Sequence, residues 1–384
     1  MSAPPFRLLF LMNEALFFTT HRLPIALEAQ ARGVEVHVAA PFDAAPVEKI
    51  RSLGFTYHDI PLARGGRNPL GDLRLLWRFV GLIRRLRPDL VHHVAMKPVV
   101  WGGLASRLLG VPAVVHAITG LGFLFIRQTV SARIMRGLLI PLYRFALHHP
   151  NARAIFQNPD DLGLFTTNAM VPGGIVDMIR GCGVDLARYA PRPLPEAPPV
   201  RVVFPARLIA DKGLREFVGA ARILKAEGLS ARFLLVGRRD PENPTDIAEA
   251  EIRGWEREGL VEWVGFSADM PAVFADAHIV CMPSYREGLP RVLIEAAACG
   301  RSIVTADVPG CREIVHDGDN GLLARVEDAE DTARALRALI VDPDLRTRMG
   351  RRGRERAETE FSVEQFVAQT LESYRRVATK GPFA

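Results

Sequence analysis

A proline-dense segment divides this chain of 384 residues into two parts of similar length. Residues 189–199 contain five prolines, which exclude a regular helix or strand there. On each side of this segment, short apolar runs that predict buried strands alternate with stretches that predict helices. We therefore predict one domain at residues 1–188, a linker at 189–199, a second domain at 200–361 and a final helical segment at 362–384.

The first part has the pattern of a parallel sheet covered by helices. Residues 6–12 form an apolar run that predicts a buried first strand. A loop is expected at 13–20, followed by a helix from about residue 21 to 32 that ends at Gly33. The next expected elements are a strand at 34–40, a helix at 70–86, and strands at 89–93 and 112–118. Their order predicts a doubly wound α/β domain.

The second part is expected to repeat this architecture. Its apolar runs predict strands at 200–205, 232–236, 261–264, 278–282 and 302–305, with helices between them. The last long helical pattern runs from Ser362 to about Ala378 and follows this domain. The fold class is therefore α/β, with two doubly wound domains.

Positive charge gathers in the first part of the chain. Residues 1–150 contain 18 Lys and Arg against 8 Asp and Glu, whereas the remainder contains 31 against 35. No acidic residue occurs between Asp89 and Asp160. A surface of one sign predicts an anionic partner, which by charge alone could be lipid headgroups, a diphosphate or nucleic acid.

Residues 123–147 combine many apolar side chains with four arginines and no acid. This composition is typical of a basic amphipathic helix on an anionic membrane, although a buried helix with arginines at its rim has the same pattern. We predict that the segment contacts the membrane surface. The uncharged run 108–126 is not expected to span the membrane, because a strand and a glycine-containing loop explain it better.

The segment from Tyr285 to Gly300 joins a loop to a helix. Pro290 is expected at the first helical position, and Gly300 closes the helix. Glu287 precedes the helix and Glu295 lies eight residues later, within it. Free backbone N–H groups at the helix start form an anion site. The segment suits a ligand with an anionic middle and hydroxyls at both ends, such as a nucleotide sugar, although a capped amphipathic helix with solvated acids is the alternative.

Two cations follow the first strand of the second domain. Arg207 lies just past the strand end, and Lys212 begins the next helix. Ligands of open α/β sheets bind beyond the carboxyl ends of the strands. Two cations at that edge fit a diphosphate and the charge it develops on leaving, although such a pair is also common on protein surfaces. Glu287 is expected at the same edge of the same sheet.

Together these residues resemble the retaining glycosyltransferases of family 4, which have the GT-B fold of two Rossmann-like domains facing a central cleft. The resemblance covers nearly the whole chain, including a final helix that crosses back onto the N-terminal domain. Glu287 and Glu295 match the family's E-x7-E motif. The resemblance implies that Glu287 contacts the donor sugar and that Glu295 accepts from the ribose hydroxyls. Arg207 and Lys212 match the Arg and Lys that grip the donor diphosphate.

Four further positions match the donor side of the family. Gly237 follows a strand, and Phe266 belongs to a segment that lines the base pocket in the family. Backbone amides around Gly288 and Leu289 are expected to hold phosphate or sugar oxygens. The resemblance implies a UDP-sugar as donor substrate and no cofactor. No metal is expected either, because Arg207 and Lys212 would neutralise the diphosphate.

A closer resemblance is to bacterial members that add N-acetylgalactosamine or a related sugar to a polyprenyl-diphosphate-linked sugar. Arg22, Lys97 and Gly120 lie in the matching stretches and are expected to bind the acceptor. The resemblance implies front-face transfer with retention, in which the leaving phosphate takes the acceptor proton. We therefore expect a cytoplasmic protein that is peripheral on the inner face of the cell membrane.

One position departs from the family pattern near the reacting sugar. Many members place a His directly before a Gly there, whereas this chain has Thr119 before Gly120, with His116 three residues earlier. His116 and Thr119 are therefore possible site residues. A hydrogen-bonded strand histidine is the structural alternative for His116.

Other functions fit parts of the sequence. A family 4 transferase could act on another acceptor, such as lipopolysaccharide core or a small glycan, and a GT-B epimerase would act on the UDP-sugar alone. A nucleic-acid-binding protein fits the basic half, but no recognised module appears, so no nucleic-acid partner is expected. A dinucleotide-dependent oxidoreductase is disfavoured because no G-x-G-x-x-G follows the first strand.

Overall fold

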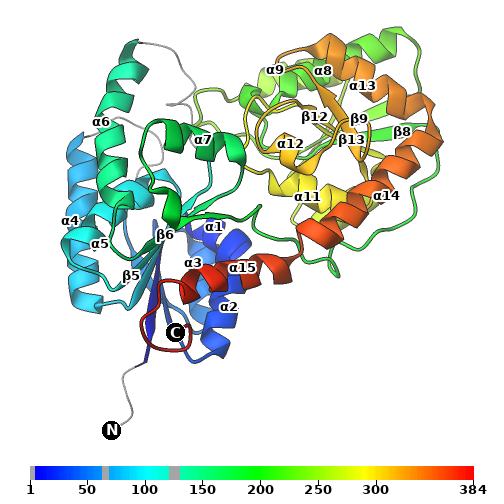
Figure 1. Cartoon of the computed structure of the whole chain (residues 1–384). Helices are drawn as coiled ribbons and strands as arrows, with labels where there is room; N and C mark the ends of the chain where they lie inside the picture. Colours follow the sequence, from blue (N-terminus) through cyan, green and yellow to red (C-terminus); the bar gives the residue numbers. More distant parts are fainter. Residues whose placement is uncertain (1–4, 63–68, 121–129) are drawn as a thin grey trace. The chain divides into compact units, whose positions relative to one another are not determined.

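The computed structural model describes residues 5–62, 69–120 and 130–384, and it divides the chain into two compact units (Figure 1). Unit 1 comprises residues 1–182 together with 364–384, and unit 2 comprises residues 183–363. Each unit is a parallel sheet with helices on both faces, which confirms the predicted fold class. Residues 190–197, in the proline-dense segment, contain no helix or strand and belong to unit 2.

The sheet of unit 1 has the strand order β3-β2-β1-β4-β5-β6-β7. Its strands are β1 (Arg7–Leu11), β2 (Glu35–Ala40), β3 (Thr56–Asp59), β4 (Leu90–Val94), β5 (Ala113–Ile118), β6 (Ala152–Phe156) and β7 (Val176–Met178). The helices and helical turns are α1 (Ala15–Phe17), η1 (Phe18–Arg22), α2 (Leu23–Ala31), α3 (Ala44–Ser52), α4 (Pro69–Leu86), η2 (Pro98–Gly102), α5 (Gly103–Leu108), α6 (Val130–Leu147), α7 (Pro159–Thr167), η4 (Gly173–Ile175) and α15 (Val363–Arg375).

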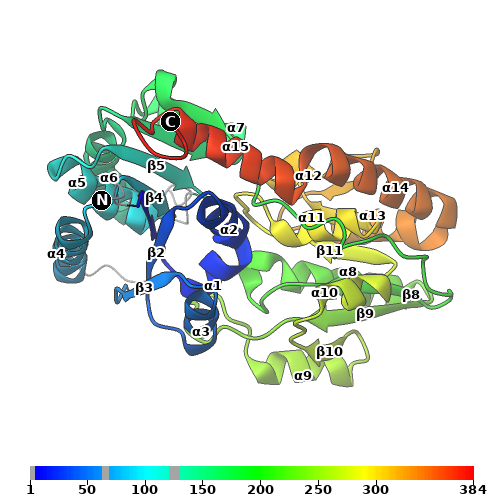
Figure 2. The same cartoon turned by 90° about the horizontal axis from the view of Figure 1, so that it is seen from below.

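Strand β1 shows why the apolar runs form buried strands. Alternate side chains of a strand point to opposite faces of the sheet, so a sheet covered on both faces needs apolar residues at every position. Leu8 and Phe10 pack in one core with α2, α3 and α15, whereas Leu9 and Leu11 pack in another with α4. Figure 2 shows α2 and α15 side by side, as Figure 1 does.

The loop expected at residues 13–20 is largely helical, which corrects that prediction. Helix α1 begins at Ala15, and η1 continues it into α2. The stretch contains neither glycine nor proline, so nothing in it interrupts a helix. The Thr20 hydroxyl donates to the Leu16 carbonyl at 2.7 Å, an interaction that fits within a helix.

The C-terminal helix α15 is part of unit 1. The hydroxyl of Tyr374 lies 2.6 Å from Nδ1 of His92 in β4, and Ser373 donates to Asp177 in β7 at 2.8 Å. Phe366 and Tyr374 also contribute to the core that contains Leu8. The helix therefore completes the hydrophobic core of unit 1 although it follows the whole of unit 2 in sequence.

The sheet of unit 2 has the order β10-β9-β8-β11-β12-β13. Its strands are β8 (Val200–Phe204), β9 (Ala231–Val236), β10 (Glu262–Gly265), β11 (Ile279–Met282), β12 (Ser302–Ala306) and β13 (Gly321–Ala324). The helices are η5 (Ala210–Lys212), α8 (Leu214–Ala226), α9 (Glu249–Arg257), α10 (Met270–Ala275), α11 (Arg291–Ala298), α12 (Cys311–Ile314), α13 (Ala329–Val341) and α14 (Pro343–Glu360). Five strands match the predicted ones to within a residue, whereas β13 was not predicted.

Strand order reverses once in each sheet, between β1 and β4 in unit 1 and between β8 and β11 in unit 2. The loops that leave such neighbouring strands turn to opposite faces, and ligands of open α/β sheets bind at this switch point. The two switch points are therefore the places in the fold where a ligand site is expected. In the described ranges, no helix combines the length and apolar character that a membrane crossing requires.

Candidate active site

The switch point of unit 2 brings together two predicted site residues, Lys212 and Glu287. Lys212 follows β8 and Glu287 follows β11, and the Lys212 ammonium forms an ion pair with Oε1 of Glu287. Both side chains are largely buried. The Tyr285 backbone N–H donates to the Asp211 carbonyl at 2.9 Å, which joins the two loops directly.

Gly213 makes this meeting of the two loops possible. Its φ is +76°, a conformation that side chains with a Cβ rarely adopt. A Cβ at this position would lie 2.0 Å from the carbonyl oxygen of Pro283, the residue that follows β11. Any larger residue would therefore push apart the loops that carry Lys212 and Glu287.

Ser284 holds Glu287 in place and was not identified from the sequence as a site residue. Its hydroxyl lies 2.7 Å from Oε1 of Glu287 and 3.1 Å from the Asp211 carbonyl. One carboxylate oxygen thus has an ammonium and a hydroxyl beside it. The other oxygen has no hydrogen-bond partner among the described residues, so it can accept from a ligand hydroxyl, which is what a sugar offers.

Arg207, the second predicted cation, pairs with a different acid. Its guanidinium contacts Oδ2 of Asp240, in the loop after β9, and its side chain is half exposed. The Asp240 backbone N–H donates to Asp246 at 2.9 Å, and Asp246 also pairs with Arg239. Arg207 therefore stands at the same edge of the sheet, held by an acid that the sequence did not identify.

Gly237 and Phe266 follow the neighbouring strands β9 and β10. A Cβ on Gly237 would lie 1.9 Å from the Ala206 carbonyl, so only glycine allows the loop after β8 to pass so close. Phe266 is 61% exposed, and the Arg238 guanidinium carbon lies 4.1 Å from the centre of its ring. An exposed aromatic ring backed by a cation offers a stacking surface for a planar base.

The backbone at Gly288 is packed against a second glycine turn. Gly310 has φ +77°, and a Cβ there would lie 2.4 Å from the Gly288 carbonyl. Leu289 packs against the core of unit 2. Gly310 precedes α12, so the turn before this helix touches the loop that carries Glu287.

Helix α11 begins one residue later than predicted. Pro290 has an extended conformation and caps the helix, and Arg291 is the first helical residue. Gly300 follows the helix with φ +69°, as the sequence predicted. The ψ angle of Pro290 is 106°, which lies outside the helical range, so the first helical turn starts after the proline.

Glu295, on α11, is paired away from the Lys212–Glu287 pair. It is 7% exposed, it accepts from Nε of Arg291 at 2.8 Å, and it shares a hydrogen bond with the Tyr189 hydroxyl. Burial raises the pKa of Glu295, and Arg291 opposes that shift. Tyr189 lies in the proline-dense segment and was not identified from the sequence.

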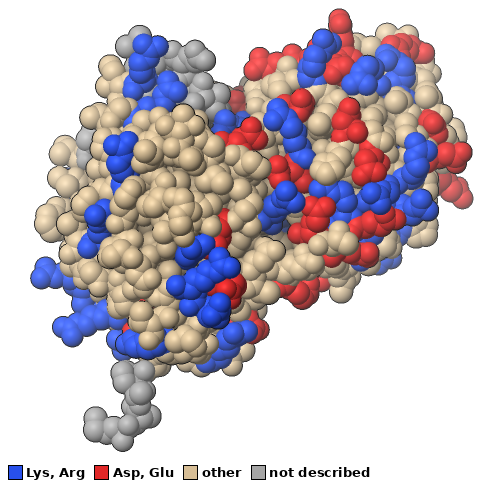
Figure 3. Space-filling view, in the orientation of Figure 1, with Lys and Arg blue, Asp and Glu red and all other residues tan. Residues whose placement is uncertain are grey.

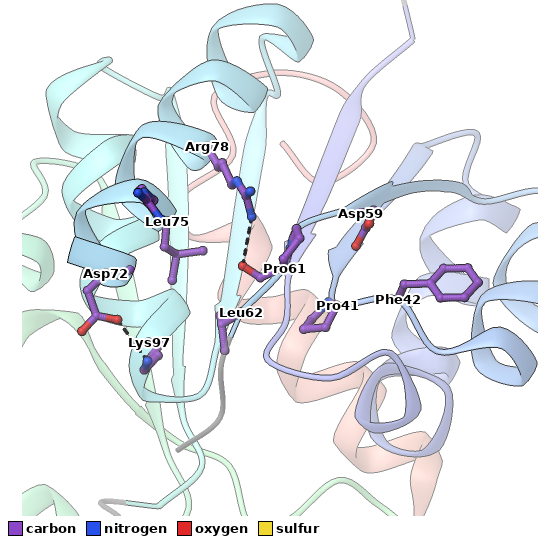
Figure 4. Close-up of a pocket in the computed structure, with 11 residues that line it drawn as sticks. Pro41, Phe42, Asp59, Pro61, Leu62, Asp72, Leu75, Arg78 and Lys97 are labelled. Carbon is purple, nitrogen blue, oxygen red and sulfur yellow. Dashed lines mark hydrogen bonds and ion pairs between the residues drawn. The ribbon is translucent and has the colours of Figure 1, made fainter. Parts of the chain in front are cut away.

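In unit 1, Lys97 follows β4 at the switch point. Its ammonium lies 3.0 Å from Oδ1 of Asp72 on α4, and both residues line a cavity of about 560 Å³ (Figure 4). Gly120 follows β5 with φ +136°, and residues 121–129, which include part of the predicted membrane segment, lie outside the described residues.

Arg22 does not join Lys97 in this cavity. It is 2% exposed, and its guanidinium carbon lies 5.3 Å from the ring centre of Phe366 on α15. Burial lowers the pKa of Arg22. The structure thus gives Arg22 a place in the core of unit 1, and its predicted contact with an acceptor has no support from this geometry.

His116 is fully buried in β5. Its ring stacks on that of His93 with 4.8 Å between centres, and burial lowers the pKa of His116 to about 3. Neither ring nitrogen has a hydrogen-bond partner among the described residues, so the expected hydrogen-bonded strand histidine is not what the structure shows. Thr119, just past the strand, is half-buried. In the described part of the chain, no group of three or more His, Cys, Asp or Glu residues could hold a metal ion.

Comparison with known proteins places a glycosyltransferase domain in each unit. Residues 7–158 match the family described as "Glycosyl transferase 4-like", and residues 199–342 match "Glycosyl transferases group 1". The N,N'-diacetylbacillosaminyl-diphospho-undecaprenol alpha-1,3-N-acetylgalactosaminyltransferase of Campylobacter jejuni is 27% identical over 97% of this chain and 99% of its own length. The putative glycosyltransferase EpsD of Bacillus subtilis is 26% identical over 96% of each chain.

Solved structures share the fold. The Anabaena protein Alr3699/HepE, crystallised with UDP, superposes with a TM-score of 0.75 at 20% identity, over 96% of this chain and 99% of its own. The lipopolysaccharide glycosyltransferase WaaG superposes with a TM-score of 0.71 at 15% identity, over 97% of this chain and 100% of its own.

Proposed function

The chain is a glycosyltransferase of family 4 with the GT-B fold, and we propose that it transfers a hexosamine-type sugar resembling N-acetylgalactosamine from a UDP-sugar to a polyprenyl-diphosphate-linked sugar, with retention. The observation that carries the donor side is the Lys212–Glu287 pair at the switch point of unit 2. The activity of the Campylobacter jejuni relative, which is similar along its whole length, supports the acceptor. In this reading, residues 1–188 bind the acceptor and residues 200–361 bind the nucleotide sugar.

Retaining front-face transfer requires a well-stabilised leaving group. The bond between the sugar C1 and the diphosphate oxygen breaks, the acceptor oxygen bonds to C1 from the same face, and the acceptor proton passes to the leaving phosphate. Arg207 and Lys212 stabilise the negative charge that develops on the diphosphate. Both cations already stand beside carboxylates in the protein, so they are oriented before the donor arrives.

The remaining donor-side residues fit the other parts of a UDP-sugar. Glu287 accepts hydrogen bonds from the sugar, with its carboxylate fixed by Ser284. Amides near Gly288 and Leu289 hold phosphate or sugar oxygens, Glu295 accepts from the ribose, and the exposed ring of Phe266 stacks on the base. Because Glu295 is already bonded to Arg291 and Tyr189, ribose binding has to rearrange that small network.

On the acceptor side, we assign Lys97 and Gly120 at the carboxyl ends of β4 and β5, with Thr119 beside Gly120. Arg22 and His116 are buried in unit 1, so we give them a role in supporting the fold there rather than a contact with the acceptor. Helix α6 is proposed to contact an anionic membrane surface on the cytoplasmic side. Its exposed Ile134 and Leu138 are four residues apart and so lie on one face of the helix. On the face drawn in Figure 3, most charged side chains of unit 1 are Lys or Arg, whereas unit 2 mixes both signs.

A panel of UDP-sugars tested against polyprenyl-diphosphate-linked sugars checks the proposal. We expect transfer from a UDP-hexosamine, with the product retaining the donor's anomeric configuration. Transfer only to lipopolysaccharide core or a soluble glycan would overturn the acceptor assignment. Conversion of the UDP-sugar in the absence of any acceptor would instead identify an epimerase.

A further inference from the structure

The cavity of about 560 Å³ in unit 1 is built at the carboxyl ends of β2, β3 and β4 (Figure 4). Its lining residues come from the loop after β2, the end of β3 and the segment that follows it, the first turns of α4 and the loop after β4. The polar ones are Asp59, Asp72, Arg74, Arg78 and Lys97. The cavity thus lies at the edge of the sheet where α/β proteins bind ligands, beside the switch point.

Two arginines of this cavity have no acidic partner within the described ranges. Asp72 is paired with Lys97, as Figure 4 shows. Arg78 makes one long hydrogen bond, from Nη1 to the Pro61 carbonyl at 3.4 Å, and Arg74 has no partner among the residues that the structure describes. Asp59 also lines the cavity but forms no ion pair with either arginine among the described residues, so three cations face two carboxylates there.

The spacing of these arginines suits two phosphates. Arg74 and Arg78 are four residues apart on α4, so they lie on one face of the helix, with Cβ atoms roughly 6 Å apart. Like charges at this spacing destabilise a helix unless an anion lies between them. A guanidinium binds phosphate oxygens in bidentate fashion, and two of them in a row can each take one phosphate of a diphosphate.

An apolar stripe runs along α4 next to these arginines. Leu70, Leu73 and Trp77 are 70%, 48% and 66% exposed, and their spacing of three and four residues places them on one side of the helix. Large apolar side chains this exposed are expected to have a partner, and tryptophan favours places where an apolar chain meets a polar headgroup. The stripe therefore offers a track for an apolar chain that leaves the basic face of the helix.

We propose that this cavity binds the diphosphate of a prenyl diphosphate ester, with Arg74 and Arg78 on the phosphates and the prenyl chain along Leu70, Leu73 and Trp77. The inference deepens the proposed function, on which it rests, by assigning where the lipid-linked acceptor is held. Inorganic diphosphate would contact only Arg74 and Arg78. A prenyl diphosphate would also contact the apolar stripe formed by Leu70, Leu73 and Trp77.

Binding of geranyl diphosphate to the full-length protein, measured by calorimetry, tests the site without requiring transferase activity. We expect the double variant R74Q/R78Q to bind at least tenfold more weakly than the unchanged protein. The matched control is R84Q/R85Q, which removes two exposed arginines from the same helix outside the cavity and should change the affinity less than twofold.

Inorganic diphosphate provides a second arm of the experiment. Trp77→Ser should weaken binding of geranyl diphosphate and leave binding of inorganic diphosphate unchanged. If R84Q/R85Q weakens binding as much as R74Q/R78Q, the positive charge of α4 attracts the diphosphate without a specific site, and the proposed site is wrong. If R74Q/R78Q binds normally, the site is also wrong.

Turnover assays separate this inference from the proposed function. Lipid-linked transfer with an unchanged acceptor KM in R74Q/R78Q would overturn the site and leave the proposed function intact. Arginine-dependent binding of geranyl diphosphate in a protein that transfers no sugar to any lipid would overturn the proposed function and support the site.

Discussion

The two units share an architecture but differ in how they treat their polar groups. At the switch point of unit 2, charged side chains neutralise one another, as in the pairs Lys212–Glu287 and Arg207–Asp240. Unit 1 has such a pair at its own switch point, Lys97–Asp72, but it also buries three uncharged imidazoles: His92, His93 and His116 are all at most 1% exposed, and burial lowers the pKa of each. Ion pairs near a ligand site can exchange partners when an anion binds, whereas a buried neutral imidazole cannot be charged without opening the fold.

The largest effect that would sharpen this comparison is expected at Lys212. Lys212→Ala removes a cation from the developing charge on the leaving diphosphate, so kcat should fall about 10²- to 10³-fold. Lys225→Ala is the control, because it removes an exposed lysine that contacts only backbone carbonyls at the far end of α8. Steady-state kinetics with the UDP-sugar donor measure the effect, and equal kcat values in the two variants would contradict the role.

The next effect concerns how unit 2 brings its charged loops together. Gly213→Ala combines an unfavourable positive φ with a Cβ placed 2.0 Å from the Pro283 carbonyl, so we expect a loss of about 2–4 kcal/mol in the free energy of unfolding. Gly228→Ala is matched in φ at +75° but has no atom within 4 Å of the new Cβ, so it should lose only about 1–2 kcal/mol. Urea unfolding of both variants checks the difference, and equal losses would show that the loop contact contributes nothing.

The buried histidines predict a pH dependence that is larger in unit 1 than in unit 2. The pKa of His116 is about 3 in the folded protein against the ordinary histidine value of 6.5, so the unfolded chain binds the proton first as pH falls. Its stabilising contribution is complete above pH 6.5 and is lost as pH falls toward 3, with about 2 kcal/mol lost between pH 6.5 and 5. His58, whose pKa is lowered to about 4, acts in the same direction.

Hydrogen exchange at pH 7 and pH 5 measures this effect in each unit. Protection in β5 should fall more than protection in β11, since unit 2 has one histidine with a lowered pKa in its described residues, His278. His116→Leu should reduce the pH dependence of β5, because leucine cannot be protonated. Equal losses of protection in the two strands would remove this contrast between the units.

The smallest effect is expected at the exposed ring of Phe266. Replacing it with Leu removes a stacking surface worth about 1 kcal/mol, so the donor KM should rise about fivefold with kcat unchanged. Val264→Ala, at a neighbouring exposed position, is the control. An unchanged donor KM in the Phe266 variant would show that the base binds elsewhere.

The sequence predicted long apolar strands well and missed some short elements. Strands such as β1 and β8 were predictable because a sheet covered on both faces requires continuous apolar runs. Helix α1 was missed because a short stretch without glycine or proline gives little indication of either loop or helix. Strand β13 was missed because Gly321 to Ala324 is only four residues long and begins with glycine.

The candidate site was predictable only where one side chain carries the chemistry. The sequence analysis singled out Lys212 because it follows the first strand of the second domain, and Glu287 because Glu295 lies eight residues later. The structure brings Lys212 and Glu287 together in an ion pair. Ser284 contacts Glu287, Asp240 pairs with Arg207, and Tyr189 shares a hydrogen bond with Glu295. The path of the folded backbone brings each of these partners into place, so their neighbours in sequence do not reveal them. Arg22 shows the converse, because a charged residue in a matching stretch proved to be buried against α15.

The product of a single turnover tests the central claim most directly. With a UDP-hexosamine and a polyprenyl-diphosphate-linked sugar, NMR of the purified product gives the configuration of the new glycosidic bond. We predict the donor's α configuration in the product of the unchanged protein, and the same product formed far more slowly by Lys212→Ala. A β-linked product, or an undiminished rate in Lys212→Ala, would contradict the account.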